Sequence, residues 1–234
     1  VTDKQIMYIG YFPQVRHERI QIKICGITAV EDALGCAAWG ADAIGLVFFP
    51  KSPRYVTPDQ AAGICSAVPP HVAKVGVFVN ESFETILSMT ERCGLTAVQL
   101  HGRETPGLAA QLRENNIFVI KCLYVHGAPG IDQADQYNAP AFLVECSAGK
   151  LPGGNAMAWD WSAARGFADT YPTVIAGGLG PDNVAGAIFQ AAPDAVDVSS
   201  GVEAAPGRKD TYKVRDFIYA VRLCKPENPT RRIF

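Results

Sequence analysis

Residues 173–191, with the sequence TVIAGGLGPDNVAGAIFQA, contain one complete unit of the pattern that decides the fold. The short apolar run at 173–176 is typical of a parallel strand that is covered on both faces. Glycines follow it, and Pro181 then opens a helical pattern over 181–191, where the missing N–H of a first-turn proline costs little. The segment therefore predicts a strand, a glycine-rich loop and a helix, in that order.

The same alternation fills most of the chain. We expect strands at 21–25, 43–48, 73–79, 97–100, 118–123, 141–145, 173–176 and 195–198. We expect helices at 29–39, 58–67, 83–93, 106–115, 131–137, 161–168, 181–191 and 210–223. Eight such units of about 25 residues match a (β/α)8 TIM barrel, an α/β fold with a parallel eight-stranded core. A doubly wound open sheet shows the same alternation and is the structural alternative; we predict the barrel.

The chain is expected to hold one domain. Residues 1–20 form an N-terminal extension to which we assign no role, and 21–224 form the catalytic barrel. Residues 225–234 form a C-terminal tail with two prolines and three basic residues, which we expect to lie loosely on the surface.

Composition narrows the class of protein. The chain has 234 residues, 48% of them hydrophobic, and a net charge of −2, which gives no reason to expect nucleic acid as a partner. No apolar run approaches the roughly 20 residues that span a bilayer, and the first 20 residues are too polar for a secretory signal. The seven cysteines include no CxxC pair, which favours a reducing cytoplasm over disulfides and argues against structural zinc.

Active sites of TIM barrels lie at the carboxyl ends of the strands and in the loops that follow them. The polar or reactive positions there are Cys25, Arg54, His101, Glu145, Asp197 and the loops at 177–180 and 199–201. The two glycine-containing loops favour a phosphate site, because glycines let backbone N–H groups approach an anion. The alternative is that these turns merely connect strand to helix.

Each reactive side chain has a functional and a structural interpretation. Cys25, beside the start of a helix, is a candidate base or nucleophile or else an inert packing group. Glu145 follows three apolar residues, so burial makes it a candidate proton donor or else it is a salt-bridged rim residue. Arg54 can grip a carboxylate or be a solvated arginine. His101 is an acid, base or structural histidine, and Asp197 faces the barrel interior and needs a partner.

Taken together, seven segments resemble the phosphoribosylanthranilate isomerase family. They are KICGIT at 23–28, GADAIGLVFFPKSPRYV at 40–56, VGVFVN at 75–80, VQLHG at 98–102, PGGNAMAWDW at 152–161, IAGGLGPDNV at 175–184 and DVSSGVEAAPGRKD at 197–210. The resemblance implies an Amadori rearrangement, the third step of tryptophan biosynthesis from chorismate, without metal or organic cofactor. It implies a small phosphosugar as the only substrate class, and a monomer or homodimer as the assembly.

The resemblance also assigns roles. Cys25 would be the base and Glu145 the acid, Arg54 would hold the anthranilate carboxylate, and His101 and Asp197 would be supporting polar contacts. The residues that would cradle the phosphate are Gly178, Gly180, Ser200 and Gly201.

The chain departs from the family in two places. Its acid is Glu145 where the family's is aspartate, and Ala156-Met157-Ala158 replaces the usual polar residues after two glycines. Two rival functions follow. One is the related Amadori isomerase of histidine biosynthesis, which uses two aspartates, against which Cys25 counts. The other is a catalytically silent barrel that binds ligands, which only Glu145 favours.

Overall fold

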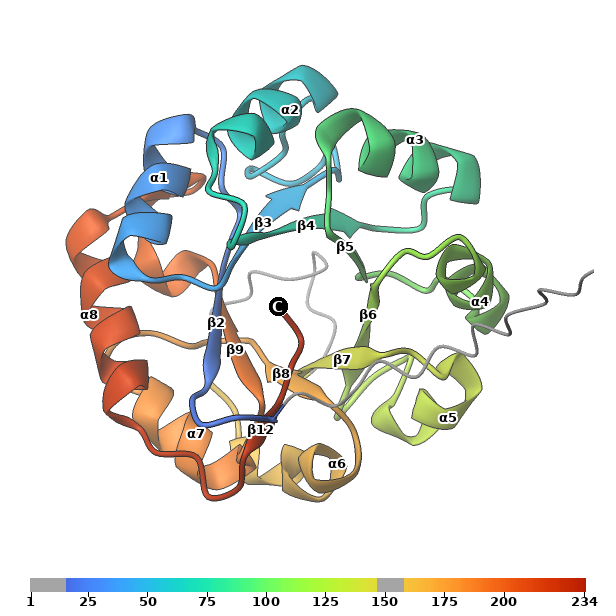
Figure 1. Cartoon of the computed structure of the whole chain (residues 1–234). Helices are drawn as coiled ribbons and strands as arrows, with labels where there is room; N and C mark the ends of the chain where they lie inside the picture. The colour runs from blue at the N-terminus through green and yellow to red at the C-terminus, as the bar shows by residue number, and fades with distance from the viewer. Residues whose placement is uncertain (1–15, 147–157) are drawn as a thin grey trace, which may run out of the picture.

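The computed structural model describes residues 16–146 and 158–234, and at its centre eight parallel strands close into a barrel in chain order. The strands are β2 (Gln21–Cys25), β3 (Ala43–Val47), β4 (Ala73–Phe78), β5 (Ala97–Leu100), β6 (Val119–Tyr124), β7 (Ala141–Glu145), β8 (Thr173–Ile175) and β9 (Ala195–Val198). Strand β9 pairs back to β2, and the helices surround the strands (Figure 1). The predicted barrel is confirmed, and the open-sheet alternative is wrong.

Helices follow the strands near their predicted positions. They are α1 (Val30–Trp39), α2 (Pro58–Ala67), α3 (Phe83–Cys93), α4 (Pro106–Glu114), α5 (Ala134–Tyr137), α6 (Arg165–Thr170), α7 (Val184–Ala191) and α8 (Thr211–Leu223). Short 3-10 turns, Ile131–Gln133 and Trp161–Ala164, lead into α5 and α6. The side chain of Thr57 accepts a hydrogen bond from the Gln60 N–H, and this cap, with Pro58 next to it, fixes the start of α2 as the sequence indicated.

Helix α7 begins at Val184, three residues after the predicted start. The side-chain oxygen of Asn183 accepts a hydrogen bond from the Gly180 N–H at 2.8 Å, and its amide donates to the Gly178 carbonyl at 2.8 Å. These two bonds hold 180–183 in a turn, because the asparagine side chain takes backbone groups that a helix would use.

The barrel interior changes character from one end to the other. Ala43, Ala97, Ala141 and Ala195, each the first residue of its strand, belong to one buried apolar cluster. Polar and reactive side chains gather at the opposite, carboxyl end, where Cys25 and Glu145 are the last residues of β2 and β7. The small side chains at the amino end leave a space that another part of the chain fills.

That part is the C-terminal tail, and the expectation that it lies loosely is wrong. Ile233 is buried in the same apolar cluster, and the Gln21 side chain accepts hydrogen bonds from the N–H groups of Ile233 and Phe234, both at 2.9 Å. Strand β12 (Thr230–Arg231) also pairs antiparallel with β1 (Arg16–His17). In Figure 1 the chain end accordingly lies across the centre of the ring of strands.

In the described ranges, no helix has the combination of length and apolar character required to cross a membrane.

Lys121 is a fully buried cation between the barrel and its helices. Its ammonium group donates to the Glu104 carboxylate at 2.6 Å and to the carbonyls of Leu100 and Gly102 at 3.1 and 2.8 Å. Glu104 in turn accepts from the Gly102 N–H and is itself buried. This cluster fixes the loop after β5.

Replacing Lys121 by methionine is expected to lower the free energy of unfolding by about 3–5 kcal/mol, because it leaves the Glu104 charge buried without its partner. Urea unfolding monitored by circular dichroism measures this. Arg92→Met, which breaks the exposed Arg92–Asp59 pair, is the control and should cost about 0–1 kcal/mol. Equal losses for the two variants would contradict the role of Lys121.

Candidate active site

The carboxyl end of the barrel brings together side chains that are far apart in the sequence. Cys25, His101, Glu145 and Asp197 come from β2, the end of β5, β7 and β9, and each is between 5% and 8% exposed. Arg54 reaches the same end from the loop after β3, since its side chain lies against Gly26, the residue after Cys25. The convergence predicted from strand positions is therefore present.

Cys25 lies beside a buried lysine that the sequence analysis did not single out. A Cβ atom added to Gly45 on the neighbouring strand would lie 2.7 Å from the Cys25 sulfur and 3.1 Å from Cε of Lys23. Glycine at this position therefore leaves room for both side chains. Burial raises the pKa of the Cys25 thiol, while the ammonium groups of Lys23 and Lys209 act in the opposite direction.

Lys23 and Asp197 form an ion pair across the seam where β2 meets β9. The two residues are register partners, and the Lys23 ammonium donates to Oδ2 of Asp197 at 2.9 Å. Burial acts to lower the pKa of Lys23, but Asp197 and Cys25 outweigh it, so the pKa is raised and the lysine is charged. The second Asp197 oxygen, Oδ1, is buried and has no protein partner in the described part of the chain.

Glu145 is poised to carry a proton near neutral pH. Its pKa is raised to about 7, mainly by burial and also by the nearby Asp197 carboxylate, while Lys23 acts in the opposite direction. Its carboxylate lies 3.8 Å from Nε2 of His101, whose pKa burial lowers to about 3. Glu145 therefore faces a neutral imidazole and is not the salt-bridged rim residue of the alternative interpretation.

His101 is held from its other ring nitrogen. Nδ1 lies 2.8 Å from the side-chain amide of Gln99, two residues earlier on the same strand. The oxygen of that amide, Oε1, is buried and has no hydrogen-bond partner among the described residues. Rotating the amide by 180° exchanges its nitrogen and oxygen, so the hydrogen bond is compatible with a proton on either ring nitrogen.

Arg54 is oriented by a carboxylate of the protein. Its Nε and Nη2 donate to the two oxygens of Glu203 at 2.8 and 2.7 Å, and the Lys209 ammonium also binds Glu203 at 3.0 Å. Gly26 has a φ of +76°, and a Cβ there would lie 2.5 Å from Cδ of Arg54. The absence of a side chain at Gly26 thus leaves room for the Arg54 side chain. The two cations, Arg54 and Lys209, share the single carboxylate of Glu203, so the group has a net positive charge that favours binding of an anion.

The two glycine-containing loops, at 177–180 and 199–201, touch one another. A Cβ on Gly201 would lie 2.0 Å from the carbonyl oxygen of Leu179, so only glycine fits where the loops after β8 and β9 meet. Gly178 has a φ of +68°, which also favours glycine. The Gly180 N–H is engaged by Asn183, and Ser200 begins a short 3-10 turn, Ser200–Val202.

Sequence reasoning missed Lys23, Gln99, Glu203, Lys209 and Trp159. For Lys23 and Gln99 there was a signal, since a long polar side chain within a short buried strand needs an internal partner. Trp159 lies over Gly177, where an added Cβ would be 3.2 Å from the indole nitrogen and 3.8 Å from Cγ of Glu145. The rest of its segment, 152–157, lies outside the described residues.

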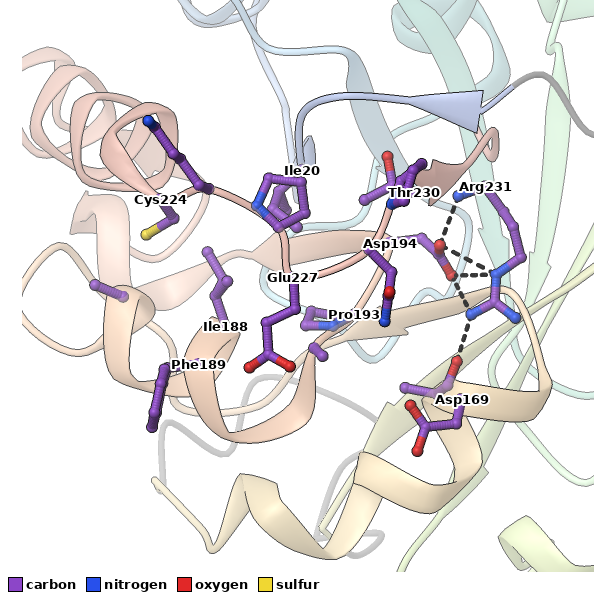
Figure 2. A pocket seen from close by; sticks show the side chains of 17 residues that line it. Ile20, Asp169, Ile188, Phe189, Pro193, Asp194, Cys224, Glu227, Thr230 and Arg231 are labelled. Carbon is purple, nitrogen blue, oxygen red and sulfur yellow. Dashed lines mark hydrogen bonds and ion pairs between the residues drawn. The ribbon is translucent and has the colours of Figure 1, made fainter.

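A pocket lies at the amino end of the barrel, away from the residues described so far. It measures about 590 Å³ and is lined by Phe189, Pro193, Asp194, Glu227 and Arg231 among others (Figure 2). In it Arg231 binds Asp194 at 2.8 Å, and Glu227 binds Arg165, which is not part of the lining, at 2.5 Å. The candidate catalytic side chains Cys25 and Glu145 lie at the opposite, carboxyl end of the barrel.

Comparisons with known proteins identify the family. A family model described as N-(5'phosphoribosyl)anthranilate (PRA) isomerase matches residues 22–220. The chain is 50% identical over 215 residues to the N-(5'-phosphoribosyl)anthranilate isomerase of Desulfatibacillum aliphaticivorans, covering 92% of this chain and 99% of that one.

Solved structures are similar as well. The phosphoribosyl anthranilate isomerase of Thermotoga maritima aligns with a TM-score of 0.80 and 43% identity, over 86% of this chain and 98% of that one. Monomers generated from the dimeric enzyme of that organism align with a TM-score of 0.77 and 41% identity over the same shares. A complex of such an isomerase with reduced 1-(o-carboxyphenylamino)-1-deoxyribulose 5-phosphate also aligns over those shares, with a TM-score of 0.77 and 43% identity.

The raised pKa of Glu145 predicts a specific dependence of stability on pH. The folded protein holds this proton more tightly than the unfolded chain, so the associated stabilisation is complete below pH 4.5 and is lost as the pH rises through about 7. We expect wild type to lose about 3 kcal/mol of unfolding free energy over this range relative to Glu145→Gln, which cannot titrate. Urea unfolding of both proteins at several pH values measures the difference, and a constant difference would contradict the raised pKa.

Proposed function

The chain belongs to the N-(5'-phosphoribosyl)anthranilate isomerase family, and from this premise we propose which of its residues carry the reaction. The activity is the Amadori rearrangement of N-(5′-phosphoribosyl)anthranilate to 1-(2-carboxyphenylamino)-1-deoxyribulose 5-phosphate, a step of tryptophan biosynthesis. The observation that carries the assignment of roles is that Cys25 and Glu145 lie at the same end of the barrel, where the Lys23–Asp197 pair acts electrostatically on both.

Glu145 is the acid of the first step. With a pKa of about 7 its carboxyl group holds a proton close to neutral pH and donates it to the ring oxygen of the ribose. The bond between C1′ and the ring oxygen breaks, and the lone pair of the anthranilate nitrogen forms a C1′=N iminium. The longer side chain of glutamate, compared with the family's aspartate, lies 3.8 Å from His101, which supports it as a polar contact.

Cys25 is the base of the second step. Its thiolate removes the proton from C2′, the C2′–H electrons form a C1′=C2′ double bond, and the iminium nitrogen becomes neutral. Addition of a proton to C1′ and loss of the proton from the C2′ hydroxyl then give the C2′ ketone. Burial disfavours the thiolate, but Lys23, Lys209 and the positive charge of the iminium all favour it, so more of the thiol is ionised once the iminium has formed.

The remaining residues each bind a different polar group of the substrate. Arg54 takes the anthranilate carboxylate with N–H groups other than those that Glu203 fixes, and the unpaired Oδ1 of Asp197 accepts from a sugar hydroxyl. Gly178, Ser200 and Gly201 surround the phosphate. The Gly180 N–H is already bonded to Asn183, so Gly180 does not donate to the phosphate; because it has no side chain, it lets the phosphate come close to the backbone.

The wider assignments rest on the family alone. We propose a cytoplasmic enzyme that acts without a cofactor on a small phosphosugar. A monomer or homodimer is the proposed assembly, which the dimeric Thermotoga maritima enzyme supports.

Turnover of freshly generated phosphoribosylanthranilate, followed by loss of its fluorescence, tests the base. We expect Cys25→Ala to lower kcat by about 10²–10⁴-fold, because proton abstraction loses its positioned acceptor. Cys36→Ala, which removes another buried thiol in α1, is the matched control and should turn over like wild type. Full activity of Cys25→Ala would discard Cys25 as the base. A folded wild type that is inactive here would favour the silent barrel, or the histidine-pathway isomerase if it turned over that aminoaldose instead.

Arg54→Lys tests the carboxylate contact. A lysine supplies one point charge in place of a planar fork, so KM should rise at least about 10-fold while kcat changes less. Steady-state kinetics beside Arg103→Lys, an exposed arginine in the loop after β5, separates this from a general charge effect. An unchanged KM would show that Arg54 does not bind the carboxylate.

A further inference from the structure

Three metal-binding side chains meet at the carboxyl ends of adjacent strands. They are His101 at the end of β5, Cys122 in β6 and Glu145 at the end of β7, all buried, with one donor atom of each lying within 4.8 Å of the others. Nε2 of His101 is 3.8 Å from Oε2 of Glu145 and 4.0 Å from the sulfur of Cys122. Cys122 has no part in the isomerase chemistry described above.

These separations are close to those of a tetrahedral metal centre. Zinc binds sulfur at about 2.3 Å and nitrogen or carboxylate oxygen at about 2.0–2.2 Å, so neighbouring ligands lie roughly 3.3–3.6 Å apart. The two His101 contacts would have to shorten by a few tenths of an ångström, and the Cys122 sulfur and the Glu145 carboxylate, which lie within 4.8 Å of one another, by up to about 1 Å. Three protein ligands leave a fourth position for water or a ligand, as in zinc sites that are not purely structural.

Gln99 provides the outer support that a metal-bound histidine needs. With Nε2 on the metal, Nδ1 carries the proton and must donate it to an acceptor. The Gln99 amide is already 2.8 Å from Nδ1, and turning its oxygen toward the ring supplies that acceptor. The charges of Lys121 and Lys23 disfavour a cation at His101, and the paired carboxylates of Glu104 and Asp197 offset part of that repulsion.

We propose that His101, Cys122 and Glu145 form a binding site for a thiophilic divalent cation such as Zn²⁺, and that occupancy of this site inhibits the isomerase. Binding displaces the thiol proton of Cys122 and any proton on Glu145 into solvent. The cation then occupies the carboxylate that donates the proton to the ring oxygen. The inhibition rests on the proposed role of Glu145, whereas the binding does not.

Cobalt reports the binding directly, without any enzymatic assay. Chelator-treated protein is titrated with Co²⁺, and the absorbance is recorded in the near-ultraviolet, where thiolate-to-cobalt charge transfer appears, and in the visible. We expect both bands in wild type and in Cys36→Ala, whose buried thiol is far from His101 in the sequence and lies on α1. Cys122→Ala should lose the charge-transfer band and bind Co²⁺ at least about 10-fold more weakly.

Inhibition by Zn²⁺ is measured separately, on the same proteins. Cys122→Ala should keep the isomerase activity of wild type while the Zn²⁺ concentration for half-inhibition rises at least about 10-fold. If that variant does not fold, Cys122→Ser, which keeps the volume but replaces the thiolate by a poor zinc ligand, takes its place in both measurements. His101→Gln should likewise weaken Co²⁺ binding.

The outcomes separate the two proposals. A charge-transfer band that survives in Cys122→Ala and disappears in Cys25→Ala would place the metal at Cys25 and overturn the site. Absence of any thiolate band in wild type would overturn it as well. A band that depends on Cys122, without loss of isomerase activity on Zn²⁺ binding, would uphold the site and contradict Glu145 as the acid.

Discussion

The ion pair between Lys23 and Asp197 is the interaction on which the rest of this structure depends. It joins the first and last strands of the barrel at directly paired positions, so it lies on the seam that closes the sheet. Because both charges are buried, either one alone would carry a large desolvation penalty. The pair also determines the electrostatics of the site. Its ammonium group favours the Cys25 thiolate, and its carboxylate helps to keep the proton on Glu145. One contact thereby serves both barrel closure and the opposite demands of acid and base.

Much of the fold could be predicted from the sequence because each βα unit carries its own signals. The apolar runs marked the strands to within a residue or two, and Thr57-Pro58 and Thr105-Pro106 marked helix starts correctly. Pro181 gave the same signal, but the helix does not start there. Asn183 bonds to Gly178 and Gly180 and thereby holds residues 180–183 in a turn. The tail was predicted wrongly for a related reason. Its prolines and charges describe local preference. Its position depends on the alanines at the amino end of the barrel and on Gln21, which is 212 residues from Ile233 in the sequence.

The site, like the fold, has parts that could be predicted from the sequence and parts that could not. Strand-end positions identified Cys25, His101 and Glu145, and the alternation in β9 correctly implied that Asp197 faces inward and needs a partner. Which partner it finds depends on how the barrel closes, and composition does not carry that information. The same limit explains why ligand spacing gave no metal site: His101, Cys122 and Glu145 are 21 and 23 residues apart, on three strands, and become neighbours only in the closed sheet. Roles for Cys25 and Glu145 remain predictions that the geometry supports.

Because the tail closes the amino end, it determines where the barrel interior can exchange protons with solvent. Ile233 and the ring of alanines fill that end with apolar side chains, and the Gln21 side chain takes up the last backbone N–H groups. Apart from Gln21, whose oxygen is already hydrogen-bonded, the described side chains of that cluster are apolar. We therefore expect protons that Cys25, Glu145 or the Lys23–Asp197 pair exchange with solvent to pass through the carboxyl end. A substrate that covers the carboxyl end would slow this exchange and favour return of the proton that Cys25 removes to the same molecule.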